Sequence, residues 1–271
     1  MLTTPYVDSL SQVTHRWRGR RVVCALLSCV AAAGWPASAQ TVQDPDDDAR
    51  AKSIVEKADQ VRFPKQGFEV GVTITTTKPG EEPDTRKYRV LSKGNENTLV
   101  LVTEPAAERG QVLLMKGRDL WIYLPTVSQP VRLGLSQRLT GQVANGDLAR
   151  ANFAGDYQAK LVRTEKIDGE TLHVLELTAL DRGVAYHRVL YWVDSTSFRP
   201  VKAEFYSLSD RLLKTCSYQN YQSMAGRVRP TRLVMKDALR NDEQSVLDYA
   251  GMQVRELPDR MFTKDFLKRL E

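Results

Sequence analysis

The sequence is poor in the residues that build disulfides and metal sites. It has three cysteines and three histidines among 271 residues. Cys24 and Cys29 lie in the first 39 residues, which we expect to be removed, so Cys216 would remain without an intramolecular disulfide partner. His173 and His187 match no zinc-binding spacing. We therefore predict a mature fold of 232 residues that is stable without disulfides or metal, with Cys216 packed in a strand.

Motifs of the common enzyme classes are also missing. The chain contains no G-x-S-x-G, no phosphate-binding P-loop and no G-x-G-x-x-G. A Ser–His–Asp triad assembles in space rather than along the chain, so the sequence alone does not decide whether such a triad is present. We expect a protein that is not an enzyme and that needs no cofactor.

Neither sign of charge dominates. The whole chain has 39 basic and 33 acidic residues, a formal net charge of +6. Residues 1–39 hold four of the arginines and one aspartate, so 35 basic and 32 acidic residues remain, about +3. That balance excludes the basic surface on which nucleic-acid binding depends. A charged fraction of 27% and a hydrophobic fraction of 42% are typical of a folded chain with a sizeable core.

The first 39 residues carry the pattern of an export signal. The basic run RWRGRR precedes the apolar stretch VVCALLSCVAAAGW, and the small-residue triplet Ala37–Ser38–Ala39 follows. A basic start, an apolar middle and an A-x-A triplet are typical of a secretory signal. We predict cleavage after Ala39 and a mature protein that works outside the cytoplasm.

Alternatives remain open for this region. Its uncharged run of 18 residues is barely long enough for a membrane anchor, and it contains Gly34 and Pro36. The sequence Leu26–Leu27–Ser28–Cys29 resembles a bacterial lipobox, but cleavage before Cys29 would leave a short apolar region. Arg20–Arg21 could indicate twin-arginine export, although nothing after them supports it.

After the signal, the pattern predicts one helix followed by many strands. Asp46–Asp48 can cap and charge a helix start, and Pro64 ends the helix. Apolar residues recur between them at helical spacing: Ala51, Ile54, Val55, Ala58 and Val61. The period then changes to two, which predicts strands over 68–75, 88–92, 98–103, 111–115 and 120–124, with a hairpin turn at 116–119.

A second group of strands follows a long break. These strands cover about 158–166, 171–179, 184–193, 200–207, 211–222, 230–237 and 244–254, with turn residues between them. Regular short strands joined by hairpin turns predict a mainly β fold, an antiparallel meander curled into a barrel or part of one. Strands and helices do not alternate, which argues against a parallel α/β sheet.

The break itself covers residues 125–157 and has no clear strand pattern. It mixes apolar residues with arginines and would suit short amphipathic helices. A stretch of this length inside a compact domain is usually functional. One interpretation is a loop packed over the end of the barrel, and the other is a lid over a cavity.

Short motifs occur in a fixed order across four segments. These are WIYLP within 109–133, GDL and then IDGE within 145–179, WVD with a downstream Phe-Arg-Pro within 186–221, and G-x-V-x-P-T within 226–237. In this order they resemble the LolA-like outer-membrane lipoprotein-sorting proteins of Gram-negative bacteria, over about residues 48–270. The chain is closer to the broad lipoprotein-sorting-like group than to the well-studied carrier, so its cargo can differ.

The resemblance implies both a fold and a function. The fold would be an incomplete antiparallel β-barrel of the LolA/LolB kind, with an N-terminal helix and a helical lid, formed by residues 40–271 as one domain. The function would be periplasmic transport of the acyl chains of lipoproteins or lipids between membranes, as part of outer-membrane biogenesis. The partner would be an inner-membrane transporter of the RND/MMPL kind. We expect a monomer, and no catalytic residues carry over.

Such a carrier needs a cavity of aliphatic and aromatic side chains, because burial of about 0.8 kcal/mol per methylene holds an acyl chain out of water. Eight residues are our candidates for its lining: Leu113, Met115, Trp121, Tyr123, Leu135, Leu139, Val189 and Tyr191. A one-residue shift in register would swap the faces of a strand, and ordinary core packing is the alternative for each residue. The alternative for the whole protein is a non-carrying envelope interaction module. Its barrel would be filled, and residues 125–157 would dock to a transporter or outer-membrane complex.

Overall fold

The computed structural model describes residues 45–150, 152–240 and 242–267. The predicted export signal, its cleavage after Ala39 and the alternatives at Cys29 lie outside these residues. Among the helices of the described ranges, none combines the length and apolar character that a membrane crossing requires.

Helix α1 (Pro45–Arg62) begins the described chain. Asp46–Asp48 lie in its first turn, where negative side chains complement the positive end of the helix dipole. All five apolar residues of the predicted buried face are at most 4% exposed. The helix ends just before Pro64, as predicted, and it contacts the sheet and a short helix described below.

Six strands form the first half of the sheet. They are β1 (Phe68–Thr77), β2 (Asp84–Lys93), β3 (Asn97–Glu104), β4 (Val112–Lys116), β5 (Asp119–Tyr123) and β6 (Val131–Leu133), with the 3-10 turn η1 (Ala106–Glu108) between β3 and β4. Each strand pairs with the next in antiparallel register. The first five match the predicted strands, whereas β6 occupies the start of the predicted break.

Seven strands form the second half. They are β9 (Tyr157–Ile167), β10 (Glu170–Ala179), β11 (Arg188–Asp194), β12 (Pro200–Tyr206), β13 (Leu212–Met224), β14 (Arg227–Asp237) and β15 (Gln244–Val254). These also pair consecutively and antiparallel, so the predicted meander is confirmed.

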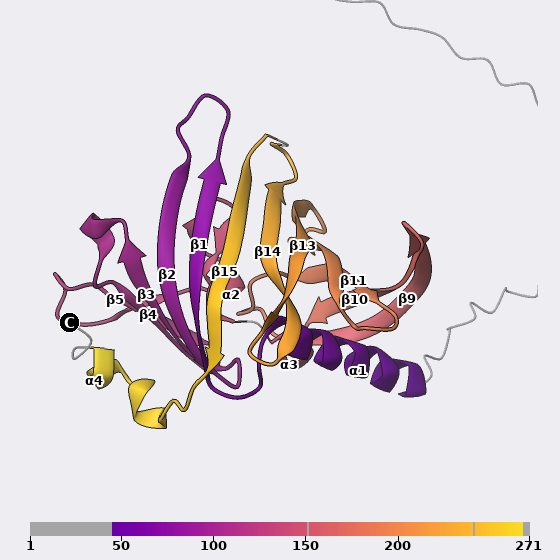
Figure 1. The fold of residues 1–271 in the computed structure, drawn as a ribbon, viewed down its shortest axis with the longest axis horizontal. Coiled ribbons are helices and arrows are strands. Elements are labelled where there is room, and N and C mark those ends of the chain that lie inside the picture. The colour runs from indigo at the N-terminus through magenta and orange to yellow at the C-terminus, as the bar shows by residue number, and fades with distance from the viewer. Residues whose placement is uncertain (1–44, 151, 241, 268–271) are drawn as a thin grey trace, which may run out of the picture. The chain divides into compact units, whose positions relative to one another are not determined.

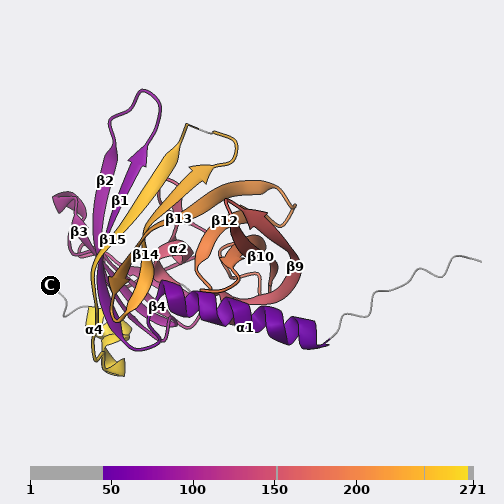
Figure 2. The same ribbon diagram turned by 45° about the vertical axis from the view of Figure 1, so that its right-hand side comes forward.

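The two halves join where β1 pairs with β15, with Phe68 opposite Val254 and Thr77 opposite Gln244. The result is one 13-stranded sheet that starts at β6, passes through β1 and β15, and ends at β9. Figures 1 and 2 show this sheet curling from β5 on one side to β9 on the other, with α1 beside β9–β13. Strands β6 and β9 remain as two edges. The predicted mainly β, incomplete barrel with an N-terminal helix is therefore confirmed.

Between β6 and β9 the chain forms four short elements: β7 (Arg138–Thr140), β8 (Val143–Ala144), α2 (Asn145–Ala149) and α3 (Phe153–Asp156). Strands β7 and β8 pair as a separate small sheet. We call residues 134–150 and 152–156 the covering segment. The predicted lid at 125–157 is thus helical only in part, since its first stretch adds β6 to the main sheet.

The main core lies between the concave face of the sheet, α1 and the covering segment. It includes apolar residues from both halves of the sheet together with Leu135, Leu148 and Phe153 of the covering segment. The curved sheet therefore encloses side chains from three separate parts of the sequence.

A second core lies on the opposite face of β2–β5. The turn η2 (Asp259–Met261) and helix α4 (Lys264–Leu267) cross this face, and the buried side chains Leu257, Phe262 and Leu267 pack on Leu99 and Leu114. The residues after β15 thus protect a sheet face that would otherwise expose apolar strands to water.

Replacement of Phe262 by alanine tests this packing. Phe262 is 1% exposed, so we expect its truncation to lower the free energy of unfolding by about 3–5 kcal/mol in urea denaturation. Leu239→Ala, at a side chain that is 72% exposed, is the control and should change stability by about 0.5 kcal/mol or less. Equal effects of the two substitutions would contradict the packing of this segment on the sheet.

Candidate functional site

The structure separates the eight predicted lining residues into two groups. Five are buried in the main core and Leu139 packs against it: the five are Leu113, Met115, Leu135, Val189 and Tyr191. Trp121 and Tyr123 instead belong to the second core, on the other face of the sheet. On β5 the inward residues are Leu120 and Ile122, so the prediction had the wrong parity for this strand. A ligand-binding role for the other six stays a prediction.

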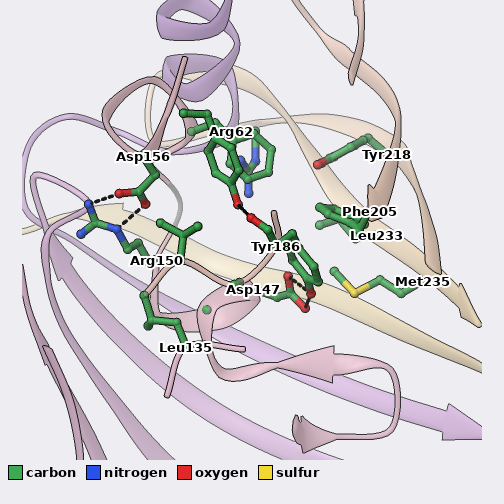
Figure 3. Close-up of a pocket in the computed structure, with 15 residues that line it drawn as sticks. Arg62, Leu135, Asp147, Arg150, Asp156, Tyr186, Phe205, Tyr218, Leu233 and Met235 are labelled. Atoms are coloured by element: carbon green, nitrogen blue, oxygen red, sulfur yellow. Dashed lines mark hydrogen bonds and ion pairs between the residues drawn. The ribbon is translucent and has the colours of Figure 1, made fainter. Parts of the chain in front are cut away.

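A small cavity lies at the centre of the main core. Its volume is about 30 Å³, which is room for about two water molecules. Apolar side chains from β12 and β14 (Phe205, Leu233, Met235) face α2 and α3 across it, as Figure 3 shows. In this conformation the interior is therefore filled by the protein's own side chains, and an acyl chain would have to displace some of them.

Helix α2 is held over this cavity by a buried polar cluster. The Lys214 ammonium donates to Asp147 at 2.6 Å and to the Gln142 carbonyl at 2.5 Å. The Tyr186 hydroxyl donates to both carboxylate oxygens of Asp147 at 2.8 Å (Figure 3). Burial is the main cause that raises the pKa of Tyr186, and the Asp147 charge adds to it. The cluster joins α2 to β13 and to the residues before β11.

Helix α3 is held by a second buried pair. Arg150 and Asp156 form a bidentate ion pair, in which Arg150 Nη2 donates to Asp156 Oδ1 at 2.7 Å. Their side chains are 5% and 6% exposed. Arg150 also donates to the Gly117 carbonyl in the β4–β5 turn at 2.6 Å. Removal of one partner from such a pair leaves an uncompensated buried charge. Movement of both partners together into water leaves no buried charge. Polar pairs thus give the covering segment a defined closed position.

A wider groove, of about 350 Å³, opens on the concave side of β2–β5 beneath the covering segment. We call it the β2–β5 groove. Its apolar lining is Tyr88, Val102, Leu113, Ile122, Leu133 and Leu139. Polar side chains including Arg86, Glu108 and Arg138 also line it. Of the predicted lining residues, Leu139 is partly exposed in this groove, whereas Leu113 lines it at 2% exposure.

One further charged pair lies where α1 meets α3. Arg62 and Asp59, both 6% exposed, are 3.5 Å apart, and the Asp59 carboxylate accepts a hydrogen bond from the Ala154 amide at 2.9 Å. Burial raises the pKa of Asp59 from its ordinary value of 3.8 to about 6, although the positive charge of Arg62 opposes the shift. This carboxylate is therefore close to half protonated in mildly acidic solution.

Among the described residues, burial affects both His173 and Cys216. The Nδ1 atom of His173 is buried without a hydrogen-bonding partner, and burial lowers the pKa of this imidazole. The Asp194 carboxylate accepts a hydrogen bond from the Ser197 hydroxyl at 2.5 Å and none from His173 Nδ1. Burial raises the pKa of the Cys216 thiol to about 12, which suits the predicted packed residue. No group of three metal-ligating side chains gathers within the described ranges.

A curved open sheet with a covered apolar concave face defines the class of incomplete antiparallel barrels, and the comparisons identify the family. A LolA superfamily protein of known structure from Nitrosomonas europaea is 61% identical to this chain, with a TM-score of 0.77, over 80% of this chain and 98% of that chain. The chain therefore belongs to the LolA superfamily. A family model described as "Uncharacterized protein" matches residues 94–269. The search of curated proteins finds no match.

Two more distant structures share the fold. A DUF1329 family protein from Desulfovibrio piger is 22% identical, with a TM-score of 0.71, over 82% of this chain and 99% of that chain. A domain from Vibrio parahaemolyticus, described as that of an outer membrane lipoprotein-sorting protein, has the same identity and TM-score, over 82% of this chain and all of that one. At this identity the likeness supports the architecture alone.

Sequence reasoning missed the buried charges of this site. Arg62, Asp59, Lys214 and Asp147 were not among the candidates, because charged residues are expected at the surface. One signal was available at Lys214, since the alternating positions Cys216 and Tyr218 on the same strand are buried. A lysine in an inward series indicates a paired internal charge.

The titration of Asp59 gives a test of its burial. Between about pH 4 and pH 6 the folded protein binds more protons at Asp59 than the unfolded chain does, so the contribution of this residue to stability falls as the pH rises. Asp59→Asn does not titrate. We therefore expect the unfolding free energy of the wild type, minus that of Asp59→Asn, to fall by about 2–3 kcal/mol from pH 4 to pH 6 in urea denaturation. A difference that stays constant or rises over this window would contradict the shift.

Proposed function

We propose that this protein carries acyl chains of lipoproteins or lipids between the membranes of the bacterial envelope. One observation carries the proposal: in the β2–β5 groove the partly exposed apolar side chains Ile122, Leu133 and Leu139 meet solvent where the covering segment borders the sheet. Exposed concave apolar surface of this kind is where ligands bind. Membership of the LolA superfamily supports the same role.

The closed interior fits a carrier that opens on loading. A sixteen-carbon chain gains about 12 kcal/mol of transfer free energy on leaving water. This gain would offset the loss of the polar contacts and of apolar contacts such as those of Leu148 and Phe153 that hold α2 and α3. Extension of the groove into the central cavity would require α2 and α3 to move outward together. A bilayer offers an acyl chain nearly the same stabilisation, so the direction of transfer would depend on docking partners. We propose a periplasmic location and an RND/MMPL-type inner-membrane transporter as one such partner.

A second candidate is the non-carrying envelope interaction module. The observation in its favour is the filled interior, where the central cavity holds only about 30 Å³. In that case the covering segment would be a permanent plug, and its outer surface would dock to a protein partner. The two functions differ in whether the groove ever contains lipid.

Native mass spectrometry of the mature protein, purified from periplasm without detergent, separates the two. We expect a mass increment that lipid extraction identifies as an acyl lipid or lipopeptide. A mass without ligand that is unchanged after incubation with lipid would refute the carrier and favour the interaction module.

The neighbouring residues Ile122 and Trp121 provide a matched pair of variants. Ile122 is partly exposed in the β2–β5 groove, so Ile122→Glu should reduce lipid occupancy about tenfold or more, because a carboxylate against an acyl chain costs about 2 kcal/mol or more. Trp121 points to the other face, where Lys264 lies 4.3 Å from its ring. Trp121→Glu should therefore retain loading. Equal loss in both variants would show that the groove is not the binding surface.

A further inference from the structure

Arg62 is a buried cation with few partners. It ends α1, and its side chain lines the central cavity. Within the described part of the chain, its single side-chain hydrogen bond is the one to Asp59, and at 3.5 Å that bond is long. A guanidinium carries five N–H donors, and a buried charge is normally paired and hydrogen-bonded. Arg62 therefore presents donors that the surrounding protein leaves unmatched.

Aromatic side chains surround this guanidinium. It lies 4.5 Å from the ring centre of Phe153 and 5.9 Å from that of Tyr218. Tyr191 is fully buried, its ring contacts both of these rings edge-on, and its hydroxyl has no hydrogen-bonding partner. Tyr191 also lies within electrostatic range of Arg62. A guanidinium with one long hydrogen bond and a hydroxyl without a partner thus belong to one cluster inside the apolar interior.

We propose that Arg62 and Tyr191 bind the carboxylate of a long-chain fatty acid whose acyl chain lies along the concave face of the sheet. The inference rests on the proposed carrier function and names its ligand class. The planar fork of a guanidinium matches a carboxylate through two parallel hydrogen bonds, and the Tyr191 hydroxyl supplies a third donor. The head group is therefore the buried end of the ligand.

The charges of the cluster favour a carboxylate over a phosphate. Arg62 supplies one positive charge, and Asp59 beside it supplies negative charge. A phosphate monoester carries about −1.5 to −2 near neutral pH, which one guanidinium cannot balance. A carboxylate adds a single negative charge, which Arg62 balances once Asp59 is protonated, and burial raises the pKa of Asp59 to about 6.

Helix α3 controls access to this cluster. Phe153 covers the guanidinium and the next residue, Ala154, donates its amide hydrogen to Asp59. Outward movement of α3 would therefore uncover Arg62 and release Asp59 in the same step. This is the movement that loading of an acyl chain requires.

Competition binding tests the head-group preference on the unmodified protein. The uncharged fluorescent probe N-phenyl-1-naphthylamine would be displaced by palmitate, 1-hexadecanol or hexadecyl phosphate, which share a chain of sixteen carbons. We expect palmitate to bind about tenfold or more tightly than hexadecanol, the gain from charge-assisted hydrogen bonds, and more tightly than hexadecyl phosphate.

Two arginine variants test whether Arg62 causes the preference for palmitate over hexadecanol. Arg62→Met should abolish the difference between palmitate and hexadecanol while hexadecanol still binds. Arg199→Met is the matched control, because Arg199 also lies over a tyrosine ring, Tyr221 at 5.2 Å, but has a side chain that is 38% exposed at the surface. This control should keep the preference for palmitate.

Each outcome decides between the proposals. Equal binding of palmitate and hexadecanol to the wild type, or tighter binding of hexadecyl phosphate than of palmitate, would overturn the fatty-acid site and leave the carrier function in place. Failure of all three to displace a bound probe would contradict both. The wild-type comparison stands even where Arg62→Met does not fold.

Discussion

An apolar concave sheet face in water has to be covered, and this requirement organises the molecule. Strands β1–β6 and β9–β15 join into one curved sheet, and its inner side chains share one core with side chains of α1 and the covering segment. Helix α1 covers part of this face, and the covering segment fills the centre with Leu135, Leu148 and Phe153. Because the hydrophobic contribution scales with apolar area removed from water, any other apolar group of suitable shape could take their place.

The means of attachment make such an exchange feasible. The covering segment contains no strand of the main sheet and is held by buried ion pairs, Lys214 with Asp147 and Arg150 with Asp156, together with apolar contacts. Ion pairs give a unique position but add little net stability over the hydrated charges, so release to water is not prohibitive. The covering segment therefore has a defined position but moderate strength of attachment. This suits a concave face that is covered by the protein's own side chains in one state and by a ligand in the other.

Periodicity in the sequence predicted most of the architecture. The two-residue period placed twelve of the thirteen strands of the main sheet, and helical spacing placed the buried face of α1. Strand β6 was missed because Val131–Leu133 is short and largely exposed at a sheet edge. The faces of β5 were reversed because both parities carry large apolar residues: Leu120 and Ile122 pack inward while Trp121 and Tyr123 pack under α4. Burial of Arg62 and Asp59 depends on tertiary contacts with α3 and was beyond the reach of local patterns.

Amide hydrogen exchange can measure whether a bound lipid displaces the covering segment from the concave face of the sheet. Exchange would be followed in the free protein and in protein whose lipid loading has been verified by mass. We expect faster exchange on loading at amides of α2 and α3, such as the Arg150 amide bonded to Gly146 and the Asp156 amide bonded to Asn152, with β1, β14 and β15 unchanged. Unchanged protection of the covering segment in a fully loaded protein would contradict this expectation.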